Sequence, residues 1–170
     1  MNALHTGRPI DNKLGSPIRA IIRLSAYLTL TVALLPIQAL AVLTRTRASK
    51  LTPILYHRLC AKIFGFRIRI HGSPSASRPT LFVSNHVSYM DITILGSLLD
   101  ASFIAKAEVS KWPLFGLLAK LDRTVFVQRR SLRAAEQRDE ISERLSDGDN
   151  LILFPEGTSA DGLHVLPFKS

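Results

Sequence analysis

Cysteine is nearly absent from this chain of 170 residues, in which Cys60 is the only one. A single cysteine excludes an intrachain disulfide and any metal centre built from several thiolates. Four histidines show no metal-ligand spacing with each other or with acidic residues, and we interpret them as structural or surface residues: His5, His57, His71 and His164. We therefore expect no metal site.

Acidic residues are also scarce, because 13 Asp and Glu stand against 22 Lys and Arg, giving a formal charge of +9. Such an excess indicates an anionic partner, for which nucleic acid, anionic lipid and phosphorylated substrates all qualify. The sequence has no recognised nucleic-acid-binding motif, and several basic residues flank a long apolar run. We expect no nucleic-acid partner and favour lipid.

The apolar run extends from Leu24 to Leu43, twenty residues without a charge. At about 1.5 Å per helical residue it is long enough to cross or deeply enter a bilayer core of about 30 Å. Basic residues at both ends suit lipid headgroups but give only a weak orientation signal: Arg19, Arg23, Arg45, Arg47 and Lys50.

Two alternatives to a spanning helix arise from the same segment. A cleavable signal peptide would have a shorter apolar core nearer the start, which disfavours it here. Pro36 could kink the helix and so favours a re-entrant or interfacial hairpin almost as much as a full span. The next stretch, Leu51 to Phe64, has the pattern of an amphipathic helix ended by Gly65. The sequence predicts membrane attachment and leaves spanning open.

We divide the chain into a polar basic tail (1–20), membrane-attachment helices (21–64) and an α/β domain (65–170). Phe66–Ile70 alternates with period two, as a half-buried edge strand would. Short apolar strands are expected at 80–83, 124–127 and 151–154, with a weaker one at 102–105, and helices at 92–99, 112–121 and 131–145. Apolar strands alternating with helices predict a largely parallel sheet flanked by helices.

Each of the three stronger strands runs directly into a polar cluster, at Ser84–His86, Gln128–Arg130 and Pro155–Ser159. Ligands of open α/β sheets bind beyond the carboxyl ends of the strands. The three clusters are therefore expected to converge on one cleft.

His86 and Asp91 are the candidate catalytic pair. Five residues apart in one helix, they would lie about 140° apart around its axis and would not meet. They can meet if His86 precedes the helix and Asp91 lies in its first turn, and Ser88–Asp91 has the Ser-x-x-acid form of a capping box with Ser88 as N-cap. A carboxylate-held imidazole is a general base able to take a proton from a hydroxyl. On spacing alone, a helix cap beside a turn histidine explains the pattern equally well.

The other clusters have plain structural alternatives too. Arg129 and Arg130 are a solvated basic pair unless a phosphate-bearing substrate uses the bidentate fork of arginine. Pro155–Ser159 is either a simple turn or a loop that binds an anion while Glu156 orients a neighbour. Lys106 and Glu108 form a surface ion pair or extend the same surface. The chain has no Gly-x-Ser-x-Gly motif, which favours direct attack by a bound alcohol.

Three ordered blocks resemble those of the glycerolipid acyltransferase family. Asn85-His86-Val87-Ser88-Tyr89-Met90-Asp91 is similar to its Asn-His-x-Ser-x-x-Asp block, and Thr124–Arg129 and Phe154–Ser159 to its second and third blocks. Ala105–Glu108 and Pro113–Gly116 also fit the family. The resemblance covers residues 70–169 and, in character, the apolar N-terminus.

This resemblance implies acyl transfer from acyl-CoA or acyl-acyl-carrier-protein to the free hydroxyl of a lysophospholipid at a membrane. His86 would be the general base and Asp91 its orienting partner, and Arg129 would hold the acceptor phosphate. Glu156, Gly157 and Thr158 would line the acceptor site, with Lys106 a weaker candidate. No metal or prosthetic group is expected. The expected location is the bacterial inner membrane, with the catalytic domain facing the cytoplasm.

Two departures from the family pattern accompany the resemblance. Gln128 stands where the family often has an acidic residue. Family members also continue beyond the segment 166–169, through a fourth block, so we expect this chain to be truncated and to lack the C-terminal part of the domain. The alternatives that stay open are the same chemistry on another lyso-lipid, such as lyso-ornithine lipid, and a non-catalytic membrane-bound fragment.

Overall fold

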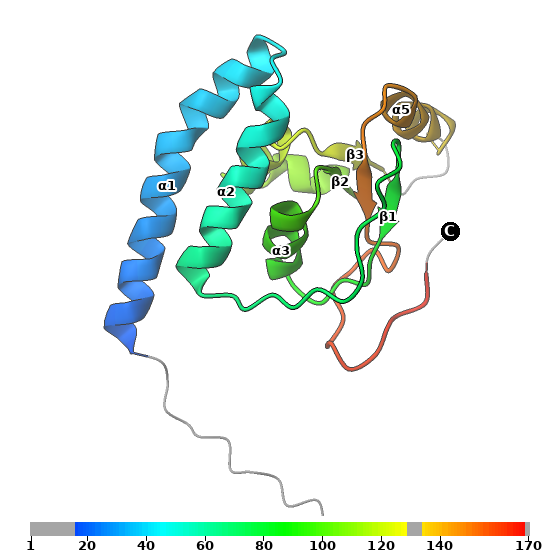
Figure 1. The fold of residues 1–170 in the computed structure, drawn as a ribbon. Coiled ribbons are helices and arrows are strands. Elements are labelled where there is room, and N and C mark those ends of the chain that lie inside the picture. The colour runs from blue at the N-terminus through cyan, green and yellow to red at the C-terminus, as the bar shows by residue number, and fades with distance from the viewer. Residues whose placement is uncertain (1–15, 129–133, 169–170) are drawn as a thin grey trace, which may run out of the picture.

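The computed structural model describes residues 16–128 and 134–168 (Figure 1). Its first feature is an antiparallel pair of helices, α1 (Pro17–Leu43) and α2 (Ala48–Phe64). Pro17 occupies the first turn of α1, where a missing N–H costs nothing, and Ser16 caps the helix. Gly65 ends α2 with φ of 76°, a left-handed cap that glycine adopts without strain. Both predicted helices are confirmed, and α1 continues through Pro36.

Helix α1 buries two polar side chains and exposes most of its large aliphatic ones. Thr31 and Gln38 are buried, and the Nε2 of Gln38 donates to the carbonyl oxygens of Ser49 and Leu121 at 3.1 and 2.6 Å. The exposed large side chains are aliphatic: Ile18, Ile21, Ile22, Leu24, Leu28, Val32, Ile37, Leu40 and Leu43. By length and composition the helix could cross a membrane. This exposed aliphatic face is the candidate membrane-attachment surface of α1.

The sheet contains strands β1 (Leu81–Val83), β2 (Ser102–Lys106), β3 (Val125–Val127) and β4 (Leu151–Leu153). All pairings are parallel and the spatial order is β1-β4-β2-β3, so the last strand in sequence lies between the first two. The prediction of an α/β fold with a largely parallel sheet is confirmed. Strand β2, the weakest in the sequence, is the longest in the structure.

Helices cover both faces of this sheet. Figure 1 shows α1, α2 and α3 (Met90–Leu98) in succession on one side and α5 (Ala134–Ser146) on the other. Gly96 allows the approach of α2 to α3, because a Cβ there would lie 2.4 Å from Cδ2 of His57. The core of the sheet is formed by Ile104, Val125 and Leu151, with α5 contributing Ile141 and Leu145.

Two expected elements differ in the structure. Phe66–Ile70 is not a strand, although Phe66 and Ile68 are half-buried and Arg67 and Arg69 exposed as the alternation suggests. A strand needs a hydrogen-bonded neighbour, and within the described residues β1 pairs only with β4. The segment expected as one helix at 112–121 is preceded by the 3₁₀ helix η1 (Ala107–Lys111), and α4 begins only at Phe115 and ends at Leu121.

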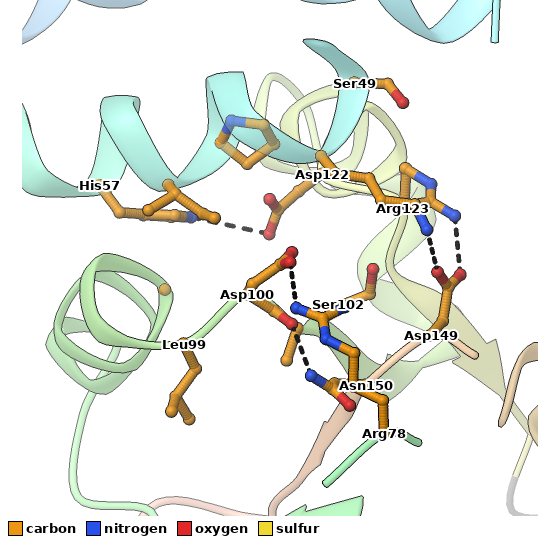
Figure 2. A pocket seen from close by; sticks show the side chains of 15 residues that line it. Ser49, His57, Arg78, Leu99, Asp100, Ser102, Asp122, Arg123, Asp149 and Asn150 are labelled. Carbon is orange, nitrogen blue, oxygen red and sulfur yellow. Dashed lines mark hydrogen bonds and ion pairs between the residues drawn. The ribbon is translucent and has the colours of Figure 1, made fainter. Parts of the chain in front are cut away.

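A charged cluster lies at the amino ends of the strands, around the hollow in Figure 2. We call it the Asp149 cluster: the carboxylate of Asp149 pairs with Lys50, Arg123 and Arg144, each at 2.7 Å. Burial alone would raise the pKa of Asp149, but hydrogen bonds from Lys50 and Arg144 and the nearby arginine charges outweigh it and hold the pKa at about 2. The cluster joins α2, the segment before β3, and α5 to the start of β4.

Candidate active site

The turn that follows β1 carries His86. The turn extends the pairing of β1 with β4, because the N–H of Ser84 donates to the carbonyl of Leu153 at 3.1 Å. Nδ1 of His86 lies 2.9 Å from Oδ2 of Asp91, which is in the first turn of α3. The predicted contact between these two side chains is therefore confirmed. His86 precedes the helix, as the spacing required.

One carboxylate oxygen of Asp91 contacts three successive residues of the turn. Besides Nδ1 of His86, Oδ2 accepts the backbone N–H groups of Val87 at 2.6 Å and Ser88 at 3.0 Å. An ionised carboxylate only accepts hydrogen bonds, so Nδ1 carries the proton and Nε2 keeps its lone pair. No side chain of residues 16–128 and 139–168 bonds to Nε2. The arrangement leaves a base with a fixed tautomer.

The predicted cap on α3 is present in a shifted form. Asp91 accepts the N–H of Ser88, as in a capping box, but Oγ of Ser88 accepts from Met90 at 3.1 Å instead of from Asp91. The helix begins at Met90 and its N-cap position is Tyr89, not Ser88. The difference is one residue and arises because Tyr89 already has helical dihedral angles.

Glu156, after β4, joins two other segments. It is fully buried, and its two carboxylate oxygens accept the backbone N–H groups of His86 at 3.0 Å and Leu166 at 3.1 Å. The carbonyl of His86 in turn accepts the N–H of Ala160 at 2.7 Å. Glu156 thus contacts the backbone of the turn that carries His86 and joins it to the segment at Leu166.

The rest of the third block forms a tight turn. The N–H of Gly157 donates to the carbonyl of Phe154 at 3.0 Å, and φ of Gly157 is 62°. Only glycine adopts this left-handed conformation freely. The turn therefore explains the glycine at this position, independently of its predicted place in the acceptor site. Thr158 is exposed. The role of both residues toward an acceptor stays a prediction.

The second block lies at the opposite edge of the sheet. Strand β3 is separated from β1 by β4 and β2, so Gln128 is not beside His86. Arg129 and Arg130 lie outside the described residues. Lys106 is the last residue of β2 and pairs with Val127. It lies at the carboxyl end of the strands, as does the turn after β4. It forms no ion pair with Glu108, which is exposed. The first and third clusters therefore meet, whereas Gln128 of the second is at the same carboxyl end of the strands but on the far edge strand.

Two contacts of the site were not expected from the sequence. The ring of Phe154 stacks on the imidazole of His86, with centroids 4.2 Å apart and planes inclined by 24°. The other is the bond from His86 N–H to Glu156, seventy residues away. Phe154 and Glu156 both lie in the block Phe154–Ser159, and this family resemblance was the only feature of the sequence that pointed to them. Among the described residues, no group of three or more His, Cys, Asp or Glu side chains could hold a metal ion.

The structure is an α/β protein with a parallel sheet, in which a carboxylate-held histidine lies in the turn after an edge strand. The sequence model of the Acyltransferase family matches residues 67–170, more than half of the chain. The protein belongs to this family.

Its curated relatives include two kinds of enzyme by name. It is 44% identical over 154 residues, which are 90% of this chain and 58% of the relative, to a lyso-ornithine lipid O-acyltransferase of Brucella abortus. It is 38% identical over 102 residues, 58% of this chain and 40% of the relative, to a 1-acyl-sn-glycerol-3-phosphate acyltransferase of Neisseria gonorrhoeae. The chain thus spans about half the length of these relatives.

A solved structure shares the fold. The 1-acyl-sn-glycerophosphate (LPA) acyltransferase PlsC from Thermotoga maritima matches with a TM-score of 0.61 at 26% identity. The match covers 89% of this chain and 66% of that one.

Proposed function

We propose that the protein transfers an acyl group from acyl-CoA or acyl-acyl-carrier-protein to the free hydroxyl of a lysolipid, with lysophosphatidic acid as acceptor and phosphatidic acid as product. The observation that carries the proposal is the His86–Asp91 pair at 2.9 Å, with no hydrogen bond to Nε2 of His86 from the side chains that the structure describes. The family membership and the names of the relatives support the substrate class.

The chemistry follows from the geometry. The acceptor hydroxyl gives its proton to Nε2 of His86 as its oxygen attacks the thioester carbonyl carbon. The tetrahedral intermediate expels the donor thiolate, and the imidazolium returns the proton to that sulfur. Asp91 fixes the tautomer and stabilises the imidazolium between these steps. The scheme uses no metal and no prosthetic group.

A second candidate acceptor is lyso-ornithine lipid. The 44% identity over 90% of the chain to a lyso-ornithine lipid O-acyltransferase favours it. The chemistry at His86 is the same for both acceptors, because each offers a free hydroxyl. They differ in the headgroup, where only lysophosphatidic acid carries a phosphate that arginine can bind bidentately.

An assay with labelled acyl donor tests the function and separates the two acceptors. This chain, and a version extended downstream to the length of its relatives, are incubated with lysophosphatidic acid or lyso-ornithine lipid. With lysophosphatidic acid as the natural acceptor, Arg129→Ala should lower kcat/KM for it about 10- to 100-fold, the loss of a charged hydrogen bond. The same variant should change transfer to lyso-ornithine lipid much less.

The control for this assay is Arg67→Ala, which removes an exposed arginine outside the site. Vesicle binding without transfer to either acceptor by both versions of the chain would establish the non-catalytic alternative. An equal Arg129→Ala defect on both acceptors would contradict a phosphate-binding role.

We also propose that the hairpin lies in the plane of the membrane instead of crossing it, at the bacterial inner membrane with the α/β domain on the cytoplasmic side. Helix α1 is held to α2 along its length, by Tyr27 against Tyr56 at one level and Gln38 on Ser49 at another. Helix α2 is itself held to α3, because Nε of Arg58 donates to the carbonyl of Ser97 at 3.0 Å. A perpendicular α1 would draw the charges of α2 into hydrocarbon, which is costly.

Cysteine labelling distinguishes the two orientations. Arg19→Cys and Arg47→Cys place exposed thiols near opposite ends of α1, while Cys60 is 1% exposed and serves as the internal control. An in-plane helix should allow a membrane-impermeant maleimide to label both positions from the cytoplasmic side only, in inside-out vesicles and not in spheroplasts. Labelling of the two positions from opposite sides would show that α1 spans the bilayer.

A further inference from the structure

The aromatic ring of Phe154 covers one face of the imidazole of His86. The two centroids are 4.2 Å apart and the planes are inclined by 24°, which is a stacked arrangement. The two residues come from neighbouring strands, because His86 follows β1 and Phe154 directly follows β4. The His86 side chain is only 14% exposed, and Asp91 binds one edge of the ring. A face contact and an edge contact therefore hold the same ring.

We propose that Phe154 is a positioning residue, which keeps the imidazole of His86 oriented with Nε2 toward the reacting hydroxyl and stabilises the imidazolium formed during transfer. The inference rests on the proposed function, in which His86 is the base. Neither the family match nor the names of the relatives assign a role to this side chain.

The stacked ring of Phe154 restricts the orientation of the imidazole. The edge contact with Asp91 is a single hydrogen bond to the ring, and one such bond permits the imidazole to tilt about the Nδ1–Oδ2 line. A flat ring packed on its face prevents this tilt. A general base must approach the proton within hydrogen-bond distance, so loss of orientation lowers the rate of the chemical step more than substrate binding.

The stack also affects the energy of the charged form of His86. The face of an aromatic ring carries partial negative charge and attracts a cation stacked upon it. His86 becomes cationic only when it holds the acceptor proton. The stack therefore stabilises the state after proton transfer more than the state before it, which is the condition for an effect on kcat. An aliphatic side chain of similar size would fill the space but would not supply this interaction.

Phe154 is in turn held by the ring of Phe103. Its ring lies parallel to that of Phe103, with centroids 6.1 Å apart and planes inclined by 13°. Phe103 is buried in β2 and meets the ring of His57 from α2 at 6.4 Å. The turn that carries Phe154 also holds the backbone of His86 through Glu156. The stack is thus a supported part of the fold.

The test compares Phe154→Leu with the conservative aromatic variant Phe154→Tyr in the acyl-transfer assay. The Leu variant should lose about 10-fold in kcat with KM changed less than about 2-fold, a magnitude within the range of a desolvated cation–π contact. The Tyr variant keeps the ring face and should retain most of kcat. Phe66→Leu is the matched control, because Phe66 pairs with Phe64 and not with the site.

A second readout does not depend on activity. The ring current of Phe154 should shift the carbon-bound imidazole protons of His86 upfield in NMR spectra, a shift kept in Phe154→Tyr and lost in Phe154→Leu. Wild-type kcat in the Leu variant, or an equal loss of kcat in both variants, would overturn the proposal. An intact ring-current shift in a wild-type protein that transfers no acyl group would instead overturn the proposed function.

Discussion

Replacing His86 by alanine is expected to lower kcat/KM for acyl transfer about 10²- to 10⁴-fold, the usual contribution of a positioned general base. Nε2 of His86 is the only nitrogen at the site with a free lone pair and a tautomer fixed from the other side, among the residues that the structure describes. Without it the acceptor hydroxyl must lose its proton to water while it attacks. The rate of labelled acyl transfer into lipid measures the effect.

The matched control for this substitution is His164→Ala. His164 is exposed, and its side chain lies 3.6 Å from the carboxylate of its neighbour Asp161, so its loss should leave the transfer rate unchanged. Binding of the lysolipid should also survive in His86→Ala, because the base acts on the reacting proton and not on the headgroup. Equal transfer by wild type and His86→Ala would refute the mechanism.

Replacing Asp149 by asparagine is expected to lower the free energy of unfolding by about 3 kcal/mol at neutral pH. Removal of one partner from a buried charge cluster costs about 3–5 kcal/mol. The lower end applies because the side chains of Lys50, Arg123 and Arg144 are 40, 25 and 20% exposed and water screens them in part. The variant also leaves three cations close together. Thermal or denaturant unfolding in detergent micelles measures the difference.

The effect of Asp149 on stability should depend on pH with a defined sign. Its pKa is lowered from 3.8 to about 2 in the folded protein, so the folded state favours the ionised form. The stabilisation is complete above the unfolded pKa and is lost as the pH falls through the folded pKa. The difference between wild type and Asp149→Asn should therefore be constant above about pH 5 and shrink toward pH 2.

The neighbouring acidic residue provides the control. Asp147 is exposed and forms no ion pair among the described residues, so Asp147→Asn should change the free energy of unfolding by less than about 0.5 kcal/mol. A variant at Asp149 no less stable than the one at Asp147 would show that the cluster contributes no net stability. Activity is a separate matter, because the Asp149 cluster and His86 lie at opposite ends of the sheet.

Much of the fold could be predicted from local patterns. Apolar runs of three or four residues predicted all of the strands, and the charge-free run predicted the longest helix. The exception, Phe66–Ile70, has the alternation of a strand but no neighbour to pair with. Whether a segment joins a sheet depends on its partner, which alternation within the segment does not show.

The site also contains contacts that could be predicted from the sequence and contacts that could not. The contact between His86 and Asp91 could be predicted because both residues lie in one short segment whose turn and helix fix their separation. The contacts of His86 with Phe154 and Glu156 cross about seventy residues and depend on β4 pairing with β1. Spacing alone contains no such information. The Asp149 cluster was missed for the same reason, since its members come from four different parts of the chain.

The order of strands in the sheet has a consequence for how the protein is made. Strand β1 pairs with β4. The turn at His86 therefore lacks its contacts with β4 and Glu156 until residue 156 has left the ribosome. At about 5–20 residues per second, the ribosome needs roughly 4–15 s to synthesise the intervening segment. During that interval the apolar hairpin is already available to the bilayer. The apolar hairpin can therefore attach to a membrane before the turn at His86 has gained its contacts with β4.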